Sequence, residues 1–135
     1  MKWKGDAHGM LERAKVWLVA KGFSQREGDN YFDTIAPNAS ITSNRLLAAM
    51  TCKLDWDLHL DVDQAFIQAE LDTDIFSRLP PGCGEMSGKV VLLNEALYGL
   101  KQSGRSWHKL LLPTLVECGF EQCLVDAFTF RLIWM

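Results

Sequence analysis

The sequence predicts an α+β fold for one domain, or for one piece of a larger domain. Three observations support this class. Segments with helical apolar spacing are interspersed with strand-like segments, and hairpin-like turn sequences separate them. The chain has 135 residues, of which 48% are hydrophobic and 23% charged, as in ordinary globular proteins. A chain of this length and composition is long enough to bury a core.

The first 21 residues predict a β-hairpin. Asp6-Ala7-His8-Gly9 is a turn sequence, because glycine can take a positive φ. Residues 22–41 are rich in Gly, Asp and Asn and predict a long ordered loop. Alternate side chains of the second strand share a face, with Val16, Leu18 and Ala20 on one side and Lys15, Trp17, Val19 and Lys21 on the other.

A helix is predicted next, capped by Thr42 or Ser43 and running to about Leu54. Its apolar stripe consists of Leu46, Leu47 and Met50. Residues 57–62 alternate between polar and apolar side chains, which predicts a half-buried strand. A short helix or turn is expected over 64–71, a turn at Pro80-Pro81-Gly82, and a strand over 90–93.

The segment 96–108 predicts a turn that leads into a helix capped by Ser103. Gly119 is placed to end that helix, and Pro113 would lie in its middle, where proline costs roughly 3 kcal/mol or kinks the helix. Residues 127–134 predict a final strand. The side chains at helical spacing are Trp107, Leu110, Leu111, Leu115 and Cys118.

Composition limits the classes of function. A net charge of -3 and a pI near 5.5 argue against a uniformly basic nucleic-acid-coating module, although they allow a local basic groove. No apolar run approaches the roughly 18 residues that span a bilayer, and the N-terminus lacks the apolar core of a signal peptide. We therefore expect an intracellular, cytoplasmic protein that is not secreted. The four cysteines show no CxxC spacing, so free and mostly buried thiols are expected.

Two short motifs suggest chemistry. In "HLDVDQAFIQAEL", Asp61 and Asp63 could form a carboxylate pair for Mg²⁺, although a solvated strand edge is the favoured reading of the motif alone. In "YGLKQSGR", Lys101 and Arg105 offer cations to phosphate or template, and the alternative is a glycine-rich turn with exposed basic residues. A Ser–His–Asp or Cys–His hydrolase is set aside, because the sequence has no Gly-x-Ser-x-Gly elbow.

Taken together, five collinear blocks resemble the reverse transcriptase domain of copia-type retrotransposons. The Tyr-Gly-Leu-Lys-Gln-Ser run is the most specific of them. The blocks are "LVAKGFSQREGDNYFDTIAP" (18–37), "LDVDQAFIQAEL" (60–71), "LPPGCG" (79–84), "ALYGLKQSGRSWH" (96–108) and "ECGFEQCLVDAFTF" (117–130).

The resemblance implies a right-hand polymerase fold, of which this chain would be a partial reverse transcriptase domain. Residues 1–56 and 72–104 would be fingers-like, and residues 57–71 and 105–135 would form part of the palm. It also implies nucleotidyl transfer by two-metal catalysis with Mg²⁺, and an RNA or DNA template-primer and deoxynucleotides as partners. For localisation, the resemblance implies cytoplasmic virus-like particles in the intact family, with no membrane among the partners.

The resemblance further assigns roles around the first motif. Asp61 matches the first catalytic, metal-binding aspartate, and the backbone carbonyl of Val62 would be a second metal ligand. Phe66 matches the aromatic residue beneath the incoming sugar, where a ring excludes a 2′-hydroxyl by steric contact. Asp63 does not carry over as a ligand, because its family position is variable.

Further nucleotide contacts are implied outside that motif. Tyr98, Gly99 and Lys101 lie in the block that packs against nucleotide and template. Lys15 and Lys21 lie on the strand face that would approach the triphosphate.

Departures from the family pattern lead us to expect no polymerase activity from this chain alone. The partner aspartates belong to a Tyr-Val-Asp-Asp hairpin, which is expected shortly after residue 135. Trp17 stands where the family usually has Arg, and one residue fewer than usual separates Trp56 from Asp61. A non-enzymatic remnant that binds nucleic acid or a partner weakly through Lys101 and Arg105, or has no function, is the alternative.

Overall fold

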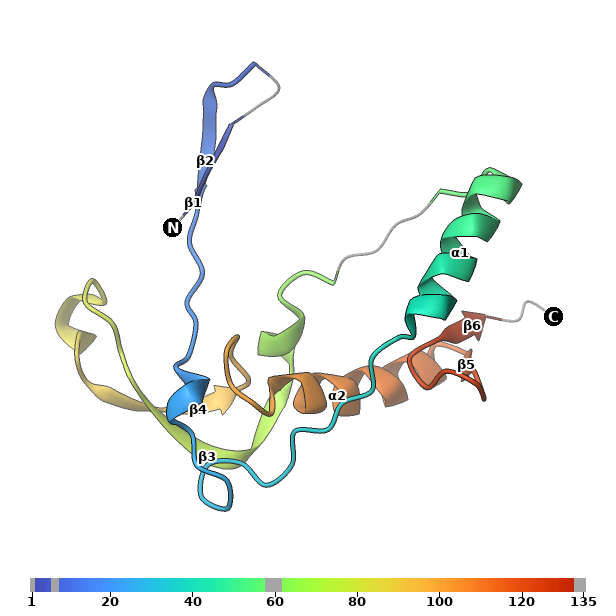
Figure 1. Cartoon of the computed structure of the whole chain (residues 1–135). Coiled ribbons are helices and arrows are strands. Elements are labelled where there is room, and N and C mark those ends of the chain that lie inside the picture. The colour runs from blue at the N-terminus through green and yellow to red at the C-terminus, as the bar shows by residue number, and fades with distance from the viewer. Residues whose placement is uncertain (1, 6–7, 58–61, 133–135) are drawn as a thin grey trace.

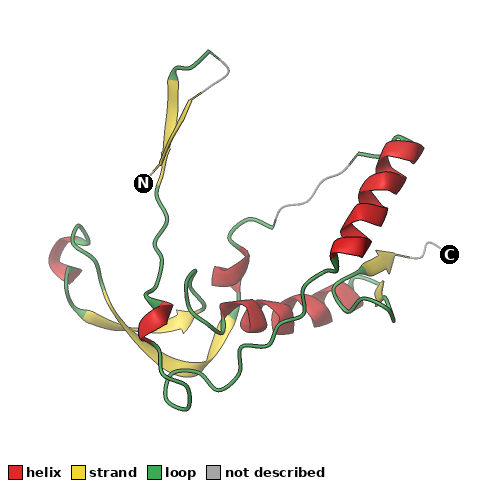
Figure 2. Ribbon diagram, viewed as in Figure 1, coloured by secondary structure: helices red, strands yellow, loops and turns green. Residues whose placement is uncertain are grey.

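The computed structural model describes residues 2–5, 8–57 and 62–132, and for residues 2–5 and 12–15 it describes the backbone alone. Helices and strands are mixed along these residues, which confirms the α+β class (Figure 2). The two α-helices described are α1 (Ile41–Leu54) and α2 (Ser103–Glu117). The strands are β1 (Lys2–Gly5), β2 (Leu11–Lys15), β3 (Glu70–Arg78), β4 (Val90–Glu95), β5 (Phe120–Gln122) and β6 (Phe130–Leu132).

The predicted N-terminal hairpin is confirmed, but its second strand is shorter than expected. β1 and β2 pair antiparallel, with Lys2 opposite Lys15, and the hairpin projects from the rest of the chain (Figure 1). The strand was expected to continue to Lys21, but residues 16–21 form no strand. Lys15 already lies opposite Lys2, the first residue of β1, so residues 16–21 have no partner in β1, and the amide of Ala20 instead donates to the carbonyl of Tyr98 at 2.7 Å.

Helix α1 is confirmed at its C-terminal end, where Asp55 takes a left-handed conformation with φ 54°. Its cap is Ser40, not Thr42 or Ser43 as predicted. The Ser40 hydroxyl accepts a hydrogen bond from the Ser43 amide at 3.0 Å, which satisfies one of the free donors of the first turn.

Asp126 ties the start of α1 to the C-terminal part of the chain. Its carboxylate accepts hydrogen bonds from the amide of Ser40 at 2.9 Å and from the amide of Phe128 at 3.0 Å. The hydroxyl of Ser43 together with these amides holds the pKa of Asp126 well below its usual value. A charged carboxylate therefore fixes α1 beside the β5–β6 turn.

The apolar stripe predicted for α1 is present but does not pack. Leu46, Leu47 and Met50 expose 61%, 42% and 40% of their surface, respectively. The whole chain exposes 10857 Å², whereas a compact protein of its 15.3 kDa mass would expose about 7,100 Å². The cysteines follow the same trend: all four are free, but Cys52, Cys83 and Cys118 are exposed rather than buried as predicted.

The middle of the chain forms the β3–β4 hairpin, of which only β4 was predicted. β3 and β4 pair antiparallel, with Ile75 opposite Leu93. The short helix expected within 64–71 is a 3₁₀ helix, η2 (Ala65–Gln68), and β3 starts two residues after it. The predicted strand 57–62 lies mostly outside the described residues, and the two of its residues that are described, Asp57 and Val62, are in no strand.

Helix α2 starts and ends where the sequence indicates, with one change at its cap. Ser103 is the first helical residue, and its hydroxyl donates to the carbonyl of Leu97 at 2.7 Å instead of capping the amides. Gly119 follows the helix with φ 88°, which confirms it as the end signal. Pro113 lies inside the helix without ending it. Of the predicted strand 127–134, residues 130–132 form β6, and β5, its antiparallel partner, was not predicted.

A small core lies where the start of α2 meets the base of the β3–β4 hairpin. Among the described residues, the buried apolar side chains are Ala69, Ile75, Ala96 and Leu100. The amide of Ala96 donates to the carbonyl of Ala69 at 2.7 Å, which closes the hairpin at its base. Within the described ranges, no helix has the length and apolar character needed to cross a membrane.

Candidate functional site

Hydrogen bonds join residues 20–25 to residues 98–102, two segments that lie more than 70 residues apart in the sequence. We call this contact the clasp. The Ala20 amide donates to the Tyr98 carbonyl at 2.7 Å, and the Lys101 amide donates to Gln25 Oε1 at 2.9 Å. Gln25 Nε2 donates in turn to Gln102 Oε1, also at 2.9 Å. The clasp therefore fixes the segment after the N-terminal hairpin against the turn before α2.

Gln102 is the centre of the clasp. Its side chain is 1% exposed, and a buried amide is costly unless its polar atoms have partners. The oxygen accepts from Gln25, and Nε2 donates to the carbonyl of Asn30 at 3.0 Å. One side chain thus holds both the segment around Gln25 and the loop around Asn30.

Two glycines allow the backbones of the clasp to approach each other. A Cβ at Gly22 would overlap the carbonyl oxygen of Gly99, and a Cβ at Gly99 would overlap the carbonyl oxygen of Ala20. Gly99 also has φ 93°, a conformation that other residues rarely adopt. Glycine is therefore required at both positions for a steric reason.

The clasp brings Tyr98 beside Phe66, another of the predicted site residues. Phe66 lies on η2 and Tyr98 follows β4, and their ring centroids are 4.9 Å apart at an interplanar angle of 47°. Both side chains are half-buried, so each ring keeps an accessible part. The structure thus assembles Phe66, Tyr98 and Gly99 in one place from two distant segments.

The predicted cationic residues differ in their surroundings. Lys21 is exposed and lines an open cleft of about 560 Å³ between residues 18–25 and β3, together with Leu97 and Leu100. Lys101 Nζ donates to the hydroxyl of Tyr31 at 3.0 Å and lies 4.7 Å from the centre of that ring. The side chain of Lys15 lies outside the described part of the structure, so its predicted role stays a prediction.

The implied Mg²⁺ ligands are described only in part. Asp61 lies outside the described residues, whereas Val62 is described and exposed. Among the described residues, no three His, Cys, Asp or Glu side chains gather in a way that could hold a metal ion. The described residues alone therefore do not make up a Mg²⁺ site.

Arg105 was predicted as an open cation, but the structure places it between two carboxylates. Its Nε donates to Asp33 at 3.0 Å and its Nη1 donates to Asp72 at 2.7 Å. Lys109 Nζ lies 2.9 Å from the same oxygen of Asp72. Hydrogen bonds from Lys109 and Arg105 hold the pKa of Asp72 below its usual value, so this carboxylate stays charged at neutral pH.

Sequence reasoning missed the residues that assemble the site. Gln25 and Gln102 end the two blocks "LVAKGFSQ" and "YGLKQ", but nothing in either block indicates that their amides pair. The ion pairs of Asp33 and Asp72 were also missed, because their partners lie 72 and 33 residues away in the sequence. The presence of a glutamine in both blocks is the one signal that could have suggested the pairing.

The comparisons with family models and with curated proteins agree on one family. A family model described as reverse transcriptase (RNA-dependent DNA polymerase) matches residues 1–130. The retrovirus-related Pol polyprotein from transposon RE1 of Arabidopsis thaliana is 37% identical over 132 residues, which cover 96% of this chain and 9% of that protein. The Pol polyprotein from transposon TNT 1-94 of Nicotiana tabacum is 38% identical over 79% of this chain and 8% of its own length.

A more distant match is the Gag-Pol polyprotein of transposon Ty1-BL from Saccharomyces cerevisiae, 32% identical over 80% of this chain and 6% of that protein. The chain therefore spans less than a tenth of the length of these curated relatives. No solved structure gives a significant match.

The contact between Gly22 and Gly99 gives a direct test of the clasp. We expect Gly22→Ala to lower the free energy of unfolding by about 3 kcal/mol, because the new Cβ collides with backbone that cannot move without breaking the clasp. Urea unfolding followed by circular dichroism measures this change.

Gly104→Ala is the matched control for that substitution. Its Cβ would meet Ala36 at 3.7 Å, an ordinary contact, and alanine is favoured over glycine within a helix by up to about 1 kcal/mol. The control is therefore expected to be neutral or stabilising. Equal effects of the two substitutions would show that Gly22 and Gly99 do not pack as described.

Proposed function

The chain belongs to the reverse transcriptase family of RNA-dependent DNA polymerases, and on that premise we propose that it forms the nucleotide-facing part of a retrotransposon polymerase. Three of the relatives are Pol or Gag-Pol polyproteins of transposons. In the intact enzyme, residues 1–56 and 72–104 would belong to the fingers of a right-hand polymerase, and residues 57–71 and 105–135 to the palm.

The observation that supports this proposal best is the contact between Phe66 and Tyr98. The two side chains come from separate sequence blocks, and their ring centroids lie 4.9 Å apart. Tyr98 is held by its own carbonyl, which accepts from the amide of Ala20. A half-buried pair of packed rings offers an apolar surface against which a sugar or base can pack.

The neighbouring groups suit the other parts of a nucleotide. Gly99 is exposed beside Tyr98, and because Ala20 fills the space where its Cβ would lie, a nucleotide would contact it from its other side. Lys21, one residue after the Ala20 bond, is exposed and carries a charge complementary to a triphosphate. Lys101 is bonded to a neutral hydroxyl, so its charge remains available to phosphate or template.

In this arrangement the residues act by binding and by exclusion. Phe66 would lie under the sugar, where its ring leaves no room for a 2′-hydroxyl, and this steric contact favours deoxynucleotides. Lys21 would hold the phosphates, with Lys15 as a second candidate. Mg²⁺, when bound by the intact enzyme, would supply the charge stabilisation of nucleotidyl transfer, with Asp61 and the Val62 carbonyl as the ligands in this chain.

We propose that the 135-residue chain alone does not extend a primer. The resemblance matches one metal-binding aspartate, Asp61, to a position in this sequence, whereas two-metal catalysis requires further carboxylates. Primer extension on poly(A)/oligo(dT) with Mg²⁺ or Mn²⁺ checks this. Extension that Asp61→Ala abolishes would contradict it.

Nucleotide binding tests the site itself. We expect the chain to bind dUTP more tightly than UTP, which differs from it only by the 2′-hydroxyl, by about tenfold, and Phe66→Ala to bring the ratio close to one, because the ring that excludes this hydroxyl is gone. Titration of each nucleotide against the aromatic NMR signals of the protein measures both dissociation constants.

Phe32→Ala is the control for loss of an aromatic ring, because Phe32 is 68% exposed and makes no ring contact with Phe66 or Tyr98 among those described. It is expected to leave the ratio unchanged. A ratio in Phe66→Ala that equals that of the unmodified chain would count against the role of Phe66.

A further inference from the structure

Three cations lie together at the start of α2. Arg105 and Lys109 are four residues apart on the helix, so they share one side of it, and Lys101 lies four residues before Arg105 in the preceding turn. Their partners join them in space: Lys101 bonds Tyr31, Arg105 bonds Asp33 on the same loop, and Arg105 shares Asp72 with Lys109. We call Lys101, Arg105 and Lys109 the basic stripe.

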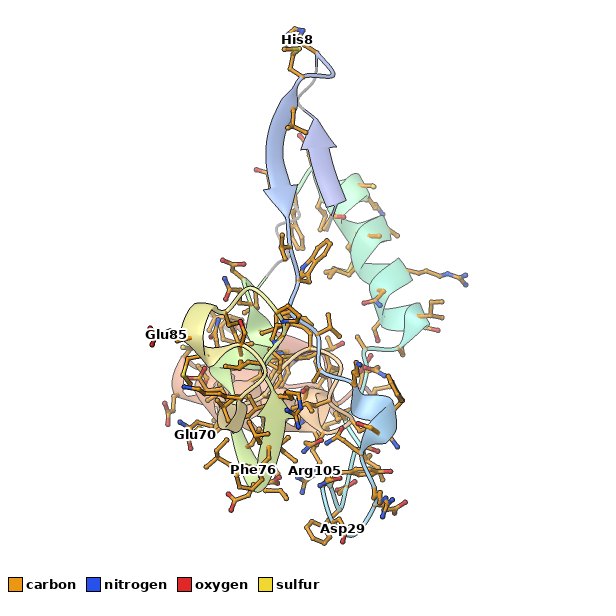
Figure 3. All side chains as sticks on the ribbon, turned by 90° about the vertical axis from the view of Figure 1, so that its left-hand side faces the viewer. His8, Asp29, Glu70, Phe76, Glu85 and Arg105 are labelled. Atoms are coloured by element: carbon orange, nitrogen blue, oxygen red, sulfur yellow. The ribbon has the colours of Figure 1, made fainter. Side chains whose placement is uncertain are left out.

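Two carboxylates from other elements cover this stripe. Asp33 comes from the loop before α1, and Asp72 comes from β3. They occupy two edges of the Arg105 guanidinium, at 3.0 Å and 2.7 Å, and Asp72 also reaches Lys109 at 2.9 Å. These are the positions and distances at which a guanidinium and an ammonium hold the oxygens of phosphate groups. Figure 3 shows Arg105 in the body of the molecule, far from His8 at the hairpin tip.

The cover is weak enough to be displaced. The side chains of Asp33, Asp72 and Lys109 are 44%, 45% and 52% exposed, and that of Arg105 is 23% exposed. Ion pairs with this much access to water contribute little to stability, because solvent screens them. A polyanion that contacts several cations at once gains the release of its condensed counterions, which exceeds this contribution at low salt.

The cluster also keeps a net positive charge. Two carboxylates face three cations, and the partner of Lys101 is a neutral hydroxyl. The net charge of the whole chain is -3, but the local positive charge of this cluster still attracts anions.

We propose that Asp33 and Asp72 form an autoinhibitory cover over the basic stripe, and that single-stranded nucleic acid binds Lys101, Arg105 and Lys109 through its phosphates by displacing them. The choice of nucleic acid as the polyanion rests on the proposed function. The cover lowers the affinity of the free chain and sets a threshold, so that only a ligand with several adjacent phosphates displaces both carboxylates.

Removal of the cover is the first test. Fluorescence anisotropy of a labelled single-stranded DNA oligonucleotide, titrated at low salt, gives the dissociation constant of each variant. We expect Asp72→Asn to tighten binding by about fivefold or more relative to Asp74→Asn, and the magnitude of the salt slope to rise by about one. Asp74 lies two residues away on the same strand and is exposed, so its substitution changes the net charge equally without uncovering the stripe.

Removal of the stripe is the second test, and it holds even if Asp72→Asn fails to fold. Arg105→Gln is expected to weaken binding by about fivefold or more relative to Lys53→Gln, which removes one charge from the far end of α1. Circular dichroism confirms the fold of each variant. Equal affinities for Asp72→Asn and Asp74→Asn, or for Arg105→Gln and Lys53→Gln, would overturn the proposal.

These measurements use no nucleoside triphosphate and do not involve Phe66. A negative result would therefore reject the covered stripe and leave the proposed nucleotide site untouched. Conversely, loss of nucleotide selectivity in the dUTP and UTP titrations would not affect the oligonucleotide data.

Discussion

The hydrogen bond between the side chains of Gln25 and Gln102 is the interaction on which the candidate site depends. The two residues are 77 positions apart, and closing a chain segment of that length costs conformational entropy. Contacts between sequence neighbours do not offset this cost, so long-range contacts must do so. Because Gln102 is buried, its side-chain amide needs hydrogen-bond partners, and an unpaired amide in the interior would cost about 1–3 kcal/mol. Lys21, Tyr98, Gly99 and Lys101 all lie in the two segments that this contact joins.

Outside the clasp, the described chain is open. The N-terminal hairpin projects from the body in Figure 1, and α1 is held at its start by the carboxylate of Asp126 while its apolar stripe remains exposed. The contrast has a physical basis. The clasp satisfies buried polar groups and so has a single arrangement, whereas the stripe of α1 consists of apolar side chains that gain nothing until another surface covers them. Tyr98 and its ring contact with Phe66 therefore belong to the part of the described chain that buried polar contacts hold in place.

The sequence predicted the local features of this fold better than its long-range ones. The β1–β2 pairing with Gly9 at a positive φ of 78°, the end of α1 and Gly119 were predicted correctly, because glycine and turn residues act within a few positions of themselves. β3 was missed because "ELDTDIFSR" is mostly polar and its strand structure comes from pairing with β4. Of the site, the family resemblance indicated Phe66 and Tyr98, but no property of a single segment indicates that their rings meet. Asp61 lies outside the described residues, so its role stays a prediction.

The coupling between Gln25 and Gln102 is the most direct test of this account. A double-mutant cycle with Gln25→Ala and Gln102→Ala, measured by urea unfolding, is expected to give a coupling of about 1 kcal/mol or more, because each side chain needs the other. The side chain of Gln122 donates to the carbonyl of Ala127, far from the clasp in the sequence, so Gln25→Ala and Gln122→Ala should be additive. Additive effects of Gln25→Ala and Gln102→Ala, within about 0.3 kcal/mol, would contradict the claim that this pair assembles the site.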